Sequence, residues 1–248
     1  MKHRIDQLLV DRGLTESREK ARALILAGEV LVNGQKAQKA GQTVDPAAAT
    51  LEVLARLPYV SRGGVKLAAA LDQFHIDPAG QPCIDIGAST GGFTDCLLQR
   101  GAARVYAFDT GAGQLAWKLR TDPRVILREN FNARYLAPAD VPELCGLAVC
   151  DVSFISATLI LPQLPPVLRE DAELVILVKP QFEVGKGQVG KGGIVRDPAL
   201  HQAACERVEN AAAALGFHSE VRASPITGAE GNQEFLLHAT RSHRRNHL

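Results

Sequence analysis

The residues best suited to chemistry are four polar ones at or beside the ends of apolar, strand-like segments. They are Asp85, Asp109, Asp151 and Lys179, each from a different segment. Ligands of open α/β sheets bind beyond the carboxyl ends of the strands. One such residue could be a solvated strand end, but four from four segments predict a shared site that contains three carboxylates and an amine.

The loop after Asp85 contains three glycines, Gly87, Gly91 and Gly92, which would let its backbone approach a ligand closely. Asp109 follows at about 20 residues, the spacing at which an acid accepts hydrogen bonds from an adenosine ribose. These features predict a ligand that contains adenosine, and they fit a dinucleotide as well as S-adenosylmethionine.

Two details of this loop favour S-adenosylmethionine. A dinucleotide needs the pattern G-x-G-x-x-G to seat its pyrophosphate at a helix N-terminus, whereas the glycines here follow the pattern G-x-x-x-G-G. The carboxylate of Asp85 would repel a phosphate and attract a cationic methionine moiety. We therefore expect the methyl donor.

Residues 185–191 have the spacing G-x-x-x-x-G-K of a phosphate-binding loop. The next residue is Gly192, so the hydroxyl that binds magnesium in such loops is missing. We expect a mobile, glycine- and lysine-rich loop that touches the substrate, and not a nucleotide triphosphatase.

The elements that must position these residues alternate between apolar strands and helical stretches from about residue 60 onward. This alternation is typical of βαβ units and predicts an α/β fold with a mostly parallel, Rossmann-like sheet. Residues 218–223 and 234–239 could add an antiparallel hairpin at one edge. The predicted parallel strands are residues 83–86, 104–109, 125–127, 147–151 and 174–179.

The first 56 residues have shorter elements and many basic side chains. Apolar spacing predicts two helices, the second over residues 17–27, and Asn33-Gly34 predicts a tight hairpin turn. Arg18 and Arg22 lie four apart and share the helix face away from its apolar side. This small α+β unit could bind phosphates through such residues, or they could form a solvated face.

Pro58 and Gly63-Gly64 interrupt regular secondary structure and indicate a boundary between the two regions. We therefore expect a small domain at residues 1–57, a linker at 58–63 and a larger domain at 64–248.

The composition limits the possible partners. The net charge of the 248 residues is +1, so local basic patches would have to bind any nucleic acid. No apolar run reaches the roughly 18 residues that span a bilayer, and the N-terminus lacks a signal-peptide core, so we expect no membrane and a cytoplasmic location. The five cysteines form no C-x-x-C pair, so neither disulfides nor a metal site is expected.

The N-terminal region resembles the small RNA-binding domain typified by a ribosomal small-subunit protein and shared by pseudouridine synthases and tyrosyl-tRNA synthetases. The matching runs are Arg4-Ile-Asp-Gln-Leu-Leu, Ser17-Arg-Glu-Lys-Ala-Arg and Leu26-Ala-Gly-Glu-Val-Leu-Val-Asn-Gly. The resemblance implies RNA binding through the two helices and the turn. Expected RNA contacts are Arg4, Arg18, Lys20, Arg22, Lys36 and, beyond this domain, Arg62.

The larger region resembles the FtsJ-like ribose methyltransferases, and the whole chain resembles the TlyA family, called hemolysin A-like or ribosomal RNA methyltransferases. The matching motifs, in order, are Ser61-Arg-Gly-Gly-Val-Lys66-Leu, Asp85-Ile-Gly-Ala-Ser-Thr-Gly-Gly-Phe-Thr, Asp109-Thr-Gly-Ala-Gly-Gln-Leu, Arg128-Glu-Asn, Cys150-Asp151-Val-Ser-Phe-Ile-Ser, Val178-Lys179-Pro-Gln-Phe-Glu, Gly192-Gly-Ile-Val-Arg-Asp-Pro and Gly231-Asn-Gln-Glu234-Phe. The cofactor contacts expected on these motifs are Asp85, Gly87, Ala88, Ser89, Gly91, Gly92, Phe93, Asp109, Gly111, Asn130 and Asp151.

The FtsJ-like enzymes use a Lys-Asp-Lys-Glu tetrad. The matching motifs place it on Lys66, Asp151, Lys179 and Glu234. The acid has two alternatives nearby in sequence, which are Glu183 and Glu230.

A ribose 2′-hydroxyl is a weak acid and a poor nucleophile, so its proton must be removed or displaced while its oxygen is held in line with the methyl group. A lysine that is partly desolvated and crowded by another cation can accept or share that proton, because both effects lower its pKa. Our hypothesis makes Lys179 the acceptor, with Asp151 and Glu234 holding the lysines and Lys66 positioning the hydroxyl. The alternative is two structural salt bridges.

The resemblance implies 2′-O-methylation of ribosomal RNA, of cytidines in the small or large subunit, and the 2′-hydroxyl occurs in RNA alone. A membrane-lytic hemolysin would need a spanning or inserting segment, and the sequence shows neither. A non-catalytic RNA-binding or ribosome-assembly protein is a further alternative, which the four filled tetrad positions disfavour. The target nucleotide and the oligomeric state stay open.

Overall fold

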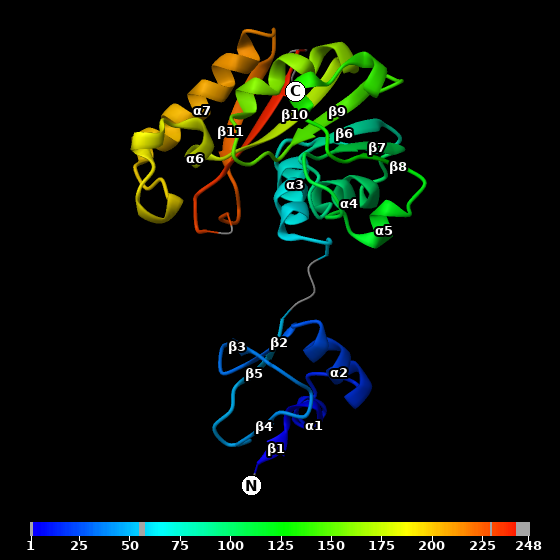
Figure 1. Ribbon diagram of the computed structural model, residues 1–248, viewed down its shortest axis with the longest axis vertical. Helices are drawn as coiled ribbons and strands as arrows, with labels where there is room; N and C mark the ends of the chain where they lie inside the picture. Colours follow the sequence, from blue (N-terminus) through cyan, green and yellow to red (C-terminus); the bar gives the residue numbers. More distant parts are fainter. Residues whose placement is uncertain (1, 55–57, 229, 242–248) are drawn as a thin grey trace, which may run out of the picture. The chain divides into compact units, whose positions relative to one another are not determined.

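A computed structural model describes residues 2–54, 58–228 and 230–241. The chain divides into two compact units, Met1–Leu57 and Pro58–Leu248 (Figure 1). The predicted linker, residues 58–63, lies inside the second unit, and its last two residues already belong to helix α3 (Arg62–Gln73). This segment belongs to the second unit because it is bonded to it: the Val60 backbone N–H donates a hydrogen bond of 2.8 Å to the Asp95 carboxylate.

The first unit packs two helices, α1 (Ile5–Asp11) and α2 (Arg18–Leu26), on short strands. Its core contains Ile5 and Leu9 of α1 and Ile25 of α2. Strand β2 (Val30–Val32) pairs in antiparallel fashion with β3 (Gln35–Lys36) and β5 (Leu51–Val53), and β1 (His3–Arg4) pairs with β4 (Thr43–Val44).

Local sequence signals explain where these elements begin and turn. The Ser17 side chain caps α2 by accepting a hydrogen bond of 3.2 Å from the Lys20 backbone N–H. Asn33 and Gly34 have φ angles of 51° and 78°, the left-handed conformation that the tight turn between β2 and β3 requires. The predicted second helix and hairpin are therefore present.

The second unit is built on a seven-stranded sheet in the order β11-β12-β10-β9-β6-β7-β8 (Figure 1). Strands β6 to β10 run parallel, and β12 is antiparallel to both β10 and β11. The α/β prediction, including the antiparallel hairpin at one edge, is confirmed. The strands are β6 (Pro82–Ile86), β7 (Arg104–Phe108), β8 (Val125–Arg128), β9 (Cys145–Cys150), β10 (Leu168–Val178), β11 (His218–Ala223) and β12 (Phe235–Thr240).

Helical segments cover both faces of this sheet. Because successive strand residues point to opposite faces, Cys83 packs in the cluster that contains α3 and α4 (Gly92–Gln99), whereas Ile84 packs in the cluster that contains α7 (Pro198–Ala213). The shorter segments are α5 (Trp117–Arg120), α6 (Pro180–Glu183), and the 3₁₀ helices η1 (Ala133–Tyr135), η2 (Pro138–Asp140), η3 (Ala157–Leu159), η4 (Leu161–Gln163), η5 (Pro165–Val167), η6 (Lys186–Gln188) and η7 (Lys191–Gly193).

In the part of the chain that the structure describes, no helix is long and apolar enough to cross a membrane, and no cluster of three or more His, Cys, Asp or Glu side chains could hold a metal ion. All five cysteines are buried and free. Burial raises the pKa of the Cys96 thiol to about 11, so it belongs to the core as a neutral side chain.

Candidate active site

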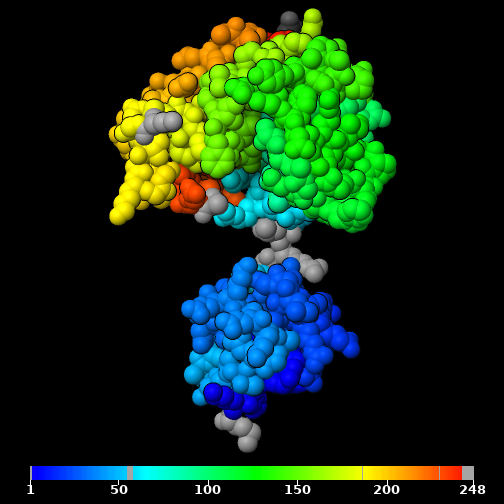
Figure 2. Space-filling view, in the orientation of Figure 1, coloured from blue at the N-terminus to red at the C-terminus, as the bar shows by residue number. Residues whose placement is uncertain are grey.

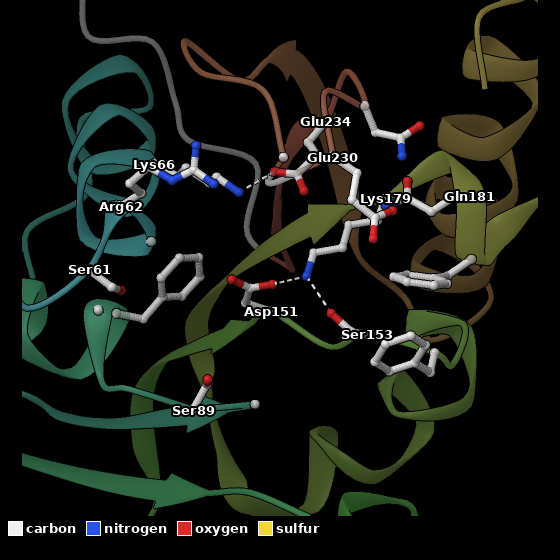
Figure 3. A pocket seen from close by; sticks show the side chains of 18 of the residues that line it. Ser61, Arg62, Lys66, Ser89, Asp151, Ser153, Lys179, Gln181, Glu230 and Glu234 are labelled. Atoms are coloured by element: carbon white, nitrogen blue, oxygen red, sulfur yellow. Dashed lines mark hydrogen bonds and ion pairs between the residues drawn. The ribbon is translucent and has the colours of Figure 1, made fainter. Parts of the chain in front are cut away.

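A cavity of about 530 Å³ lies in the second unit beside the carboxyl ends of β6, β9 and β10 (Figure 3). Residues from α3, from the loop after β6 and from the segments that follow β9 and β10 contribute to its wall. The yellow segment that follows β10 projects from this unit in Figure 2, and two of its residues, Val189 and Gly193, also line the cavity.

All four predicted tetrad residues line this cavity, and they form two ion pairs. The Lys66 ammonium contacts the Glu234 carboxylate, and the side chains of both residues are almost completely buried. The Lys179 Nζ atom lies 2.5 Å from Asp151 Oδ1 and donates a hydrogen bond of 2.9 Å to Ser153 Oγ (Figure 3). Each lysine therefore faces a carboxylate.

The register of the sheet explains why these residues meet. Lys179 follows Val178, the last residue of β10, and Val178 is paired with Phe235, the first residue of β12. Glu234 directly precedes Phe235, so it lies at the same sheet end as Lys179. Asp151 follows β9, the parallel neighbour of β10 on the other side.

The three candidate acids have different surroundings. Glu183 is buried and accepts hydrogen bonds from the Ser156 hydroxyl and the Ala157 backbone N–H, at 2.5 and 2.7 Å, away from the cavity. Glu230 is exposed at the cavity wall, and Glu234 is the one paired with Lys66. The geometry thus favours Glu234 as the fourth member.

A second cavity, of about 420 Å³, adjoins the first. Both are lined by Gly87, Ser89, Asp151, Ser153 and Phe154. The second cavity extends beyond the ends of β6 and β7, where it is lined by Asp109, Gly111, Gln114, Phe131, Asn132 and Ile155, among others. A ligand that occupied it could reach the Lys179 side of the first cavity past Gly87 and Asp151.

The Asp109 carboxylate is held in place by two backbone groups. The Ser89 N–H donates to Oδ2 at 2.7 Å, and the Gly111 N–H donates to Oδ1 at 2.6 Å. Each carboxylate oxygen retains a lone pair, because an ionised carboxylate can accept about four hydrogen bonds. Asp109 is therefore an oriented acceptor at the cavity wall.

Three residues expected to contact a ligand do not line either cavity. Asp85 is fully buried, accepts a hydrogen bond of 2.6 Å from the Thr94 hydroxyl, and leaves Oδ1 without a hydrogen-bond partner. Burial raises the pKa of the Asp85 carboxyl to about 7. Gly91, at φ +95°, faces Leu115 and Leu119, and Asn130 is an exposed turn residue. The other expected residues, Gly87, Ala88, Ser89, Gly92, Phe93, Asp109, Gly111 and Asp151, do line the cavities.

Several lining residues were not singled out from the sequence. Ser153 lies two residues after Asp151, and Phe154 has a positive φ of 66° and is 92% exposed. The Phe154 ring centroid lies 5.3 Å from that of Phe182, which follows Lys179. The sequence could have indicated both phenylalanines as lining residues, because each belongs to a motif that contains a tetrad residue.

Comparison with known proteins identifies both units. The FtsJ-like methyltransferase family model matches residues 59–241, and the S4 domain model matches residues 3–48. The chain belongs to the FtsJ-like methyltransferases. Its S4 domain and its relatives place it in the TlyA family within them.

Two relatives and one solved structure show the extent of the TlyA likeness. The 16S/23S rRNA (cytidine-2′-O)-methyltransferase TlyA of Mycobacterium tuberculosis is 50% identical over 94% of this chain and 88% of its own length. The 23S rRNA (cytidine-2′-O)-methyltransferase TlyA of Campylobacter jejuni is 35% identical over 92% and 96%. A candidate hemolysin from Streptococcus thermophilus superimposes with a TM-score of 0.75 at 46% identity, over 97% of this chain and 89% of the other.

The basic residues predicted to bind RNA fall into different settings. In the S4 domain Arg4, Arg18 and Arg22 all turn toward Asp6, while Lys20 pairs with Glu16. Lys36 is exposed next to the hairpin turn. Arg62 is exposed in the FtsJ-like unit, where it lines the larger cavity.

Proposed function

We propose that this chain is an S-adenosylmethionine-dependent methyltransferase that methylates the ribose 2′-hydroxyl of cytidine in ribosomal RNA. The observation that carries the proposal is the pair of adjoining cavities, which share Gly87 and Asp151. One contains two lysine–carboxylate pairs, and the other contains an oriented acid. The names of the M. tuberculosis and C. jejuni relatives support ribosomal cytidine as the target.

The smaller cavity fits the adenosine part of the methyl donor. The remaining lone pairs of Asp109 suit ribose hydroxyls, and Phe131 and Ile155 offer apolar surface for the adenine ring. Gly87, Ala88 and Ser89 of the loop after β6 line the cavities, whereas the buried Asp85 carboxyl does not, so the loop and not Asp85 would contact the methyl donor. When bound, S-adenosylmethionine supplies an electrophilic methyl group.

The larger cavity supplies the groups that handle the ribose hydroxyl. Lys179 Nζ lies 2.5 Å from Asp151 Oδ1 and donates a hydrogen bond of 2.9 Å to Ser153 Oγ, and these two contacts hold the side chain at the cavity wall. In the proposed reaction the Lys179 amine takes the proton of the ribose hydroxyl as the oxygen bonds to the methyl group. Lys66, oriented by Glu234, would donate to the ribose oxygen and position it.

Side chains at the rim of the larger cavity suit an RNA nucleotide that has left its stack. Arg62 is exposed there and can bind a phosphate, and the exposed ring of Phe154 offers a surface for a base. The S4 domain would hold the surrounding ribosomal RNA, and ribosomal subunits are accordingly the proposed partners.

Replacing Ser153 with alanine should lower kcat about tenfold and leave KM for RNA unchanged, because it removes one of the two acceptors that orient the Lys179 amine. Threonine at this position should restore much of the rate. Single-turnover methyl transfer measures both. Ser156→Ala is the matched control, since the Ser156 hydroxyl binds Glu183 away from the cavity. An unchanged rate for Ser153→Ala would contradict this role.

Replacing Gly87 with alanine should weaken S-adenosylmethionine binding about a hundredfold, because small displacements of a binding loop are costly. A Cβ atom there would collide with the Asp151 carbonyl oxygen, and φ is +86°. Gly113→Ala controls for backbone strain, since Gly113 has a φ of +71° and open space around it. Calorimetric titration measures the affinities, and equal values for the two variants would refute a steric role for Gly87.

The proposed activity is tested by transfer of a tritiated methyl group from S-adenosylmethionine to purified 30S and 50S ribosomal subunits, followed by mapping of the modified nucleotide. We expect label on the 2′-oxygen of a cytidine. Label on a base, or no label in either subunit, would overturn the proposal.

A further inference from the structure

Three arginines of the S4 domain converge on one buried carboxylate. Arg4 donates two hydrogen bonds to Asp6, from Nε to Oδ1 at 2.9 Å and from Nη2 to Oδ2 at 2.8 Å. Arg18 Nη2 and Arg22 Nε each donate to Oδ2 at 3.2 Å. We call these four residues the Asp6 cluster. It joins the first turn of α1 to one face of α2.

The carboxylate of the Asp6 cluster is buried, whereas its three arginines are about half exposed. The Asp6 side chain is inaccessible to solvent, whereas the side chains of Arg4, Arg18 and Arg22 are 46%, 46% and 52% exposed. Each guanidinium has five N–H donors, and the carboxylate uses only one or two of them. The remaining donors are therefore available at the surface, from three side chains that share one anchor.

The charges of the cluster do not cancel. Three guanidinium groups and one carboxylate leave an excess of two positive charges, while the carboxylate reduces the mutual repulsion of the arginines. The guanidinium of Arg4, bound to Asp6, holds the pKa of that carboxyl well below its usual range. Asp6 is thus ionised at neutral pH.

We infer that Asp6 is a positioning residue that arranges Arg4, Arg18 and Arg22 into a single binding site for phosphodiester groups of RNA. Planar guanidinium groups bind phosphate oxygens in pairs, and their affinity gains from being held in place before the RNA arrives. A surface that needed positive charge alone would bind more strongly without a carboxylate, so the buried Asp6 indicates that orientation matters. This inference rests on the proposed action on ribosomal RNA.

Two substitutions with the same change in charge separate orientation from charge. Asp6→Asn and Glu16→Gln each remove one negative charge from the S4 domain. Glu16 is an exposed residue that pairs with Lys20 at 2.8 Å and lies outside the Asp6 cluster. If charge alone governs binding, both variants should bind RNA as tightly as the unmodified protein or more tightly.

We expect Asp6→Asn to bind ribosomal subunits about tenfold more weakly than the unmodified protein, with a shallower dependence of affinity on salt because fewer phosphates are contacted. Glu16→Gln should bind at least as tightly as the unmodified protein. Filter binding of the full chain over a range of KCl concentrations measures both quantities. Equal affinity of the two variants would overturn the inference.

A second variant covers the case in which Asp6→Asn disturbs folding, which circular dichroism would reveal. Arg22→Lys keeps the charge, loses the planar fork and changes a half-exposed residue. It should weaken binding of ribosomal subunits about threefold, and an unchanged affinity would also refute the inference. Failure of the unmodified protein to bind or methylate any subunit would instead count against the proposed function.

Discussion

Replacing Lys179 with alanine should reduce methyl transfer to ribosomal RNA by a factor of about 10² to 10⁴, the usual contribution of a general base. The reason is that its amine, bound to Asp151 and Ser153, is the group proposed to take the proton of the ribose hydroxyl. S-adenosylmethionine affinity, measured by calorimetry, should stay within about twofold of the unmodified protein's, since a lost proton acceptor changes the chemical step and not ground-state binding.

Lys179→Arg distinguishes proton transfer from simple electrostatics. Arginine keeps the positive charge and can bind the Asp151 carboxylate, but its guanidinium stays protonated in proteins. We therefore expect Lys179→Arg to be nearly as inactive as Lys179→Ala in single-turnover assays. An arginine variant with close to normal activity would show that the lysine acts through its charge, and the proposed proton acceptor would be wrong.

The second large effect concerns the buried pair of Lys66 and Glu234, which are 8% and 3% exposed. Lys66→Met should cost about 3–5 kcal/mol of stability, because it leaves the Glu234 carboxylate buried without its cation. Glu234→Gln should also be destabilising, because it leaves the buried Lys66 ammonium without its carboxylate partner. Chemical denaturation measures both losses, and methyl transfer should fall in each variant.

The double variant Lys66→Met/Glu234→Gln decides between a structural and a functional pair. With both charges removed, most of the lost stability should return, since replacing a buried ion pair by neutral side chains is often close to neutral. Methyl transfer should stay low, because no cation is left to position the ribose hydroxyl. If the double variant recovered activity along with stability, the pair would be a structural salt bridge, which is the alternative that the sequence left open.

Much of the fold could be predicted because its signals are local. Apolar runs of strand length, separated by helical stretches, determine the α/β class, and Asn33-Gly34 determines the hairpin turn of the S4 domain. Polar residues at strand ends predicted where the site lies, since parallel strands bring their carboxyl ends to one edge. The structure has two cavities at that edge, and the site itself stays a prediction.

The sequence by itself therefore determined the fold class and the family, and it predicted a site at the carboxyl ends of the parallel strands. Only the tertiary structure decided which carboxylate serves which cation, because that depends on register and burial. The pairing of Val178 with Phe235 brings Glu234, and not Glu183, to the cavity. Asp85, despite its place in the motif, is enclosed by the packing around Thr94.

In the S4 domain, too, the contacts between side chains could not be predicted from the sequence. Helical spacing places Arg18 and Arg22 on one face, but nothing in that spacing shows that Arg4 joins them around Asp6. That arrangement depends on how α1 packs against α2. Contacts between residues distant in the chain are set by the packing of whole elements, so patterns within a single element cannot specify them.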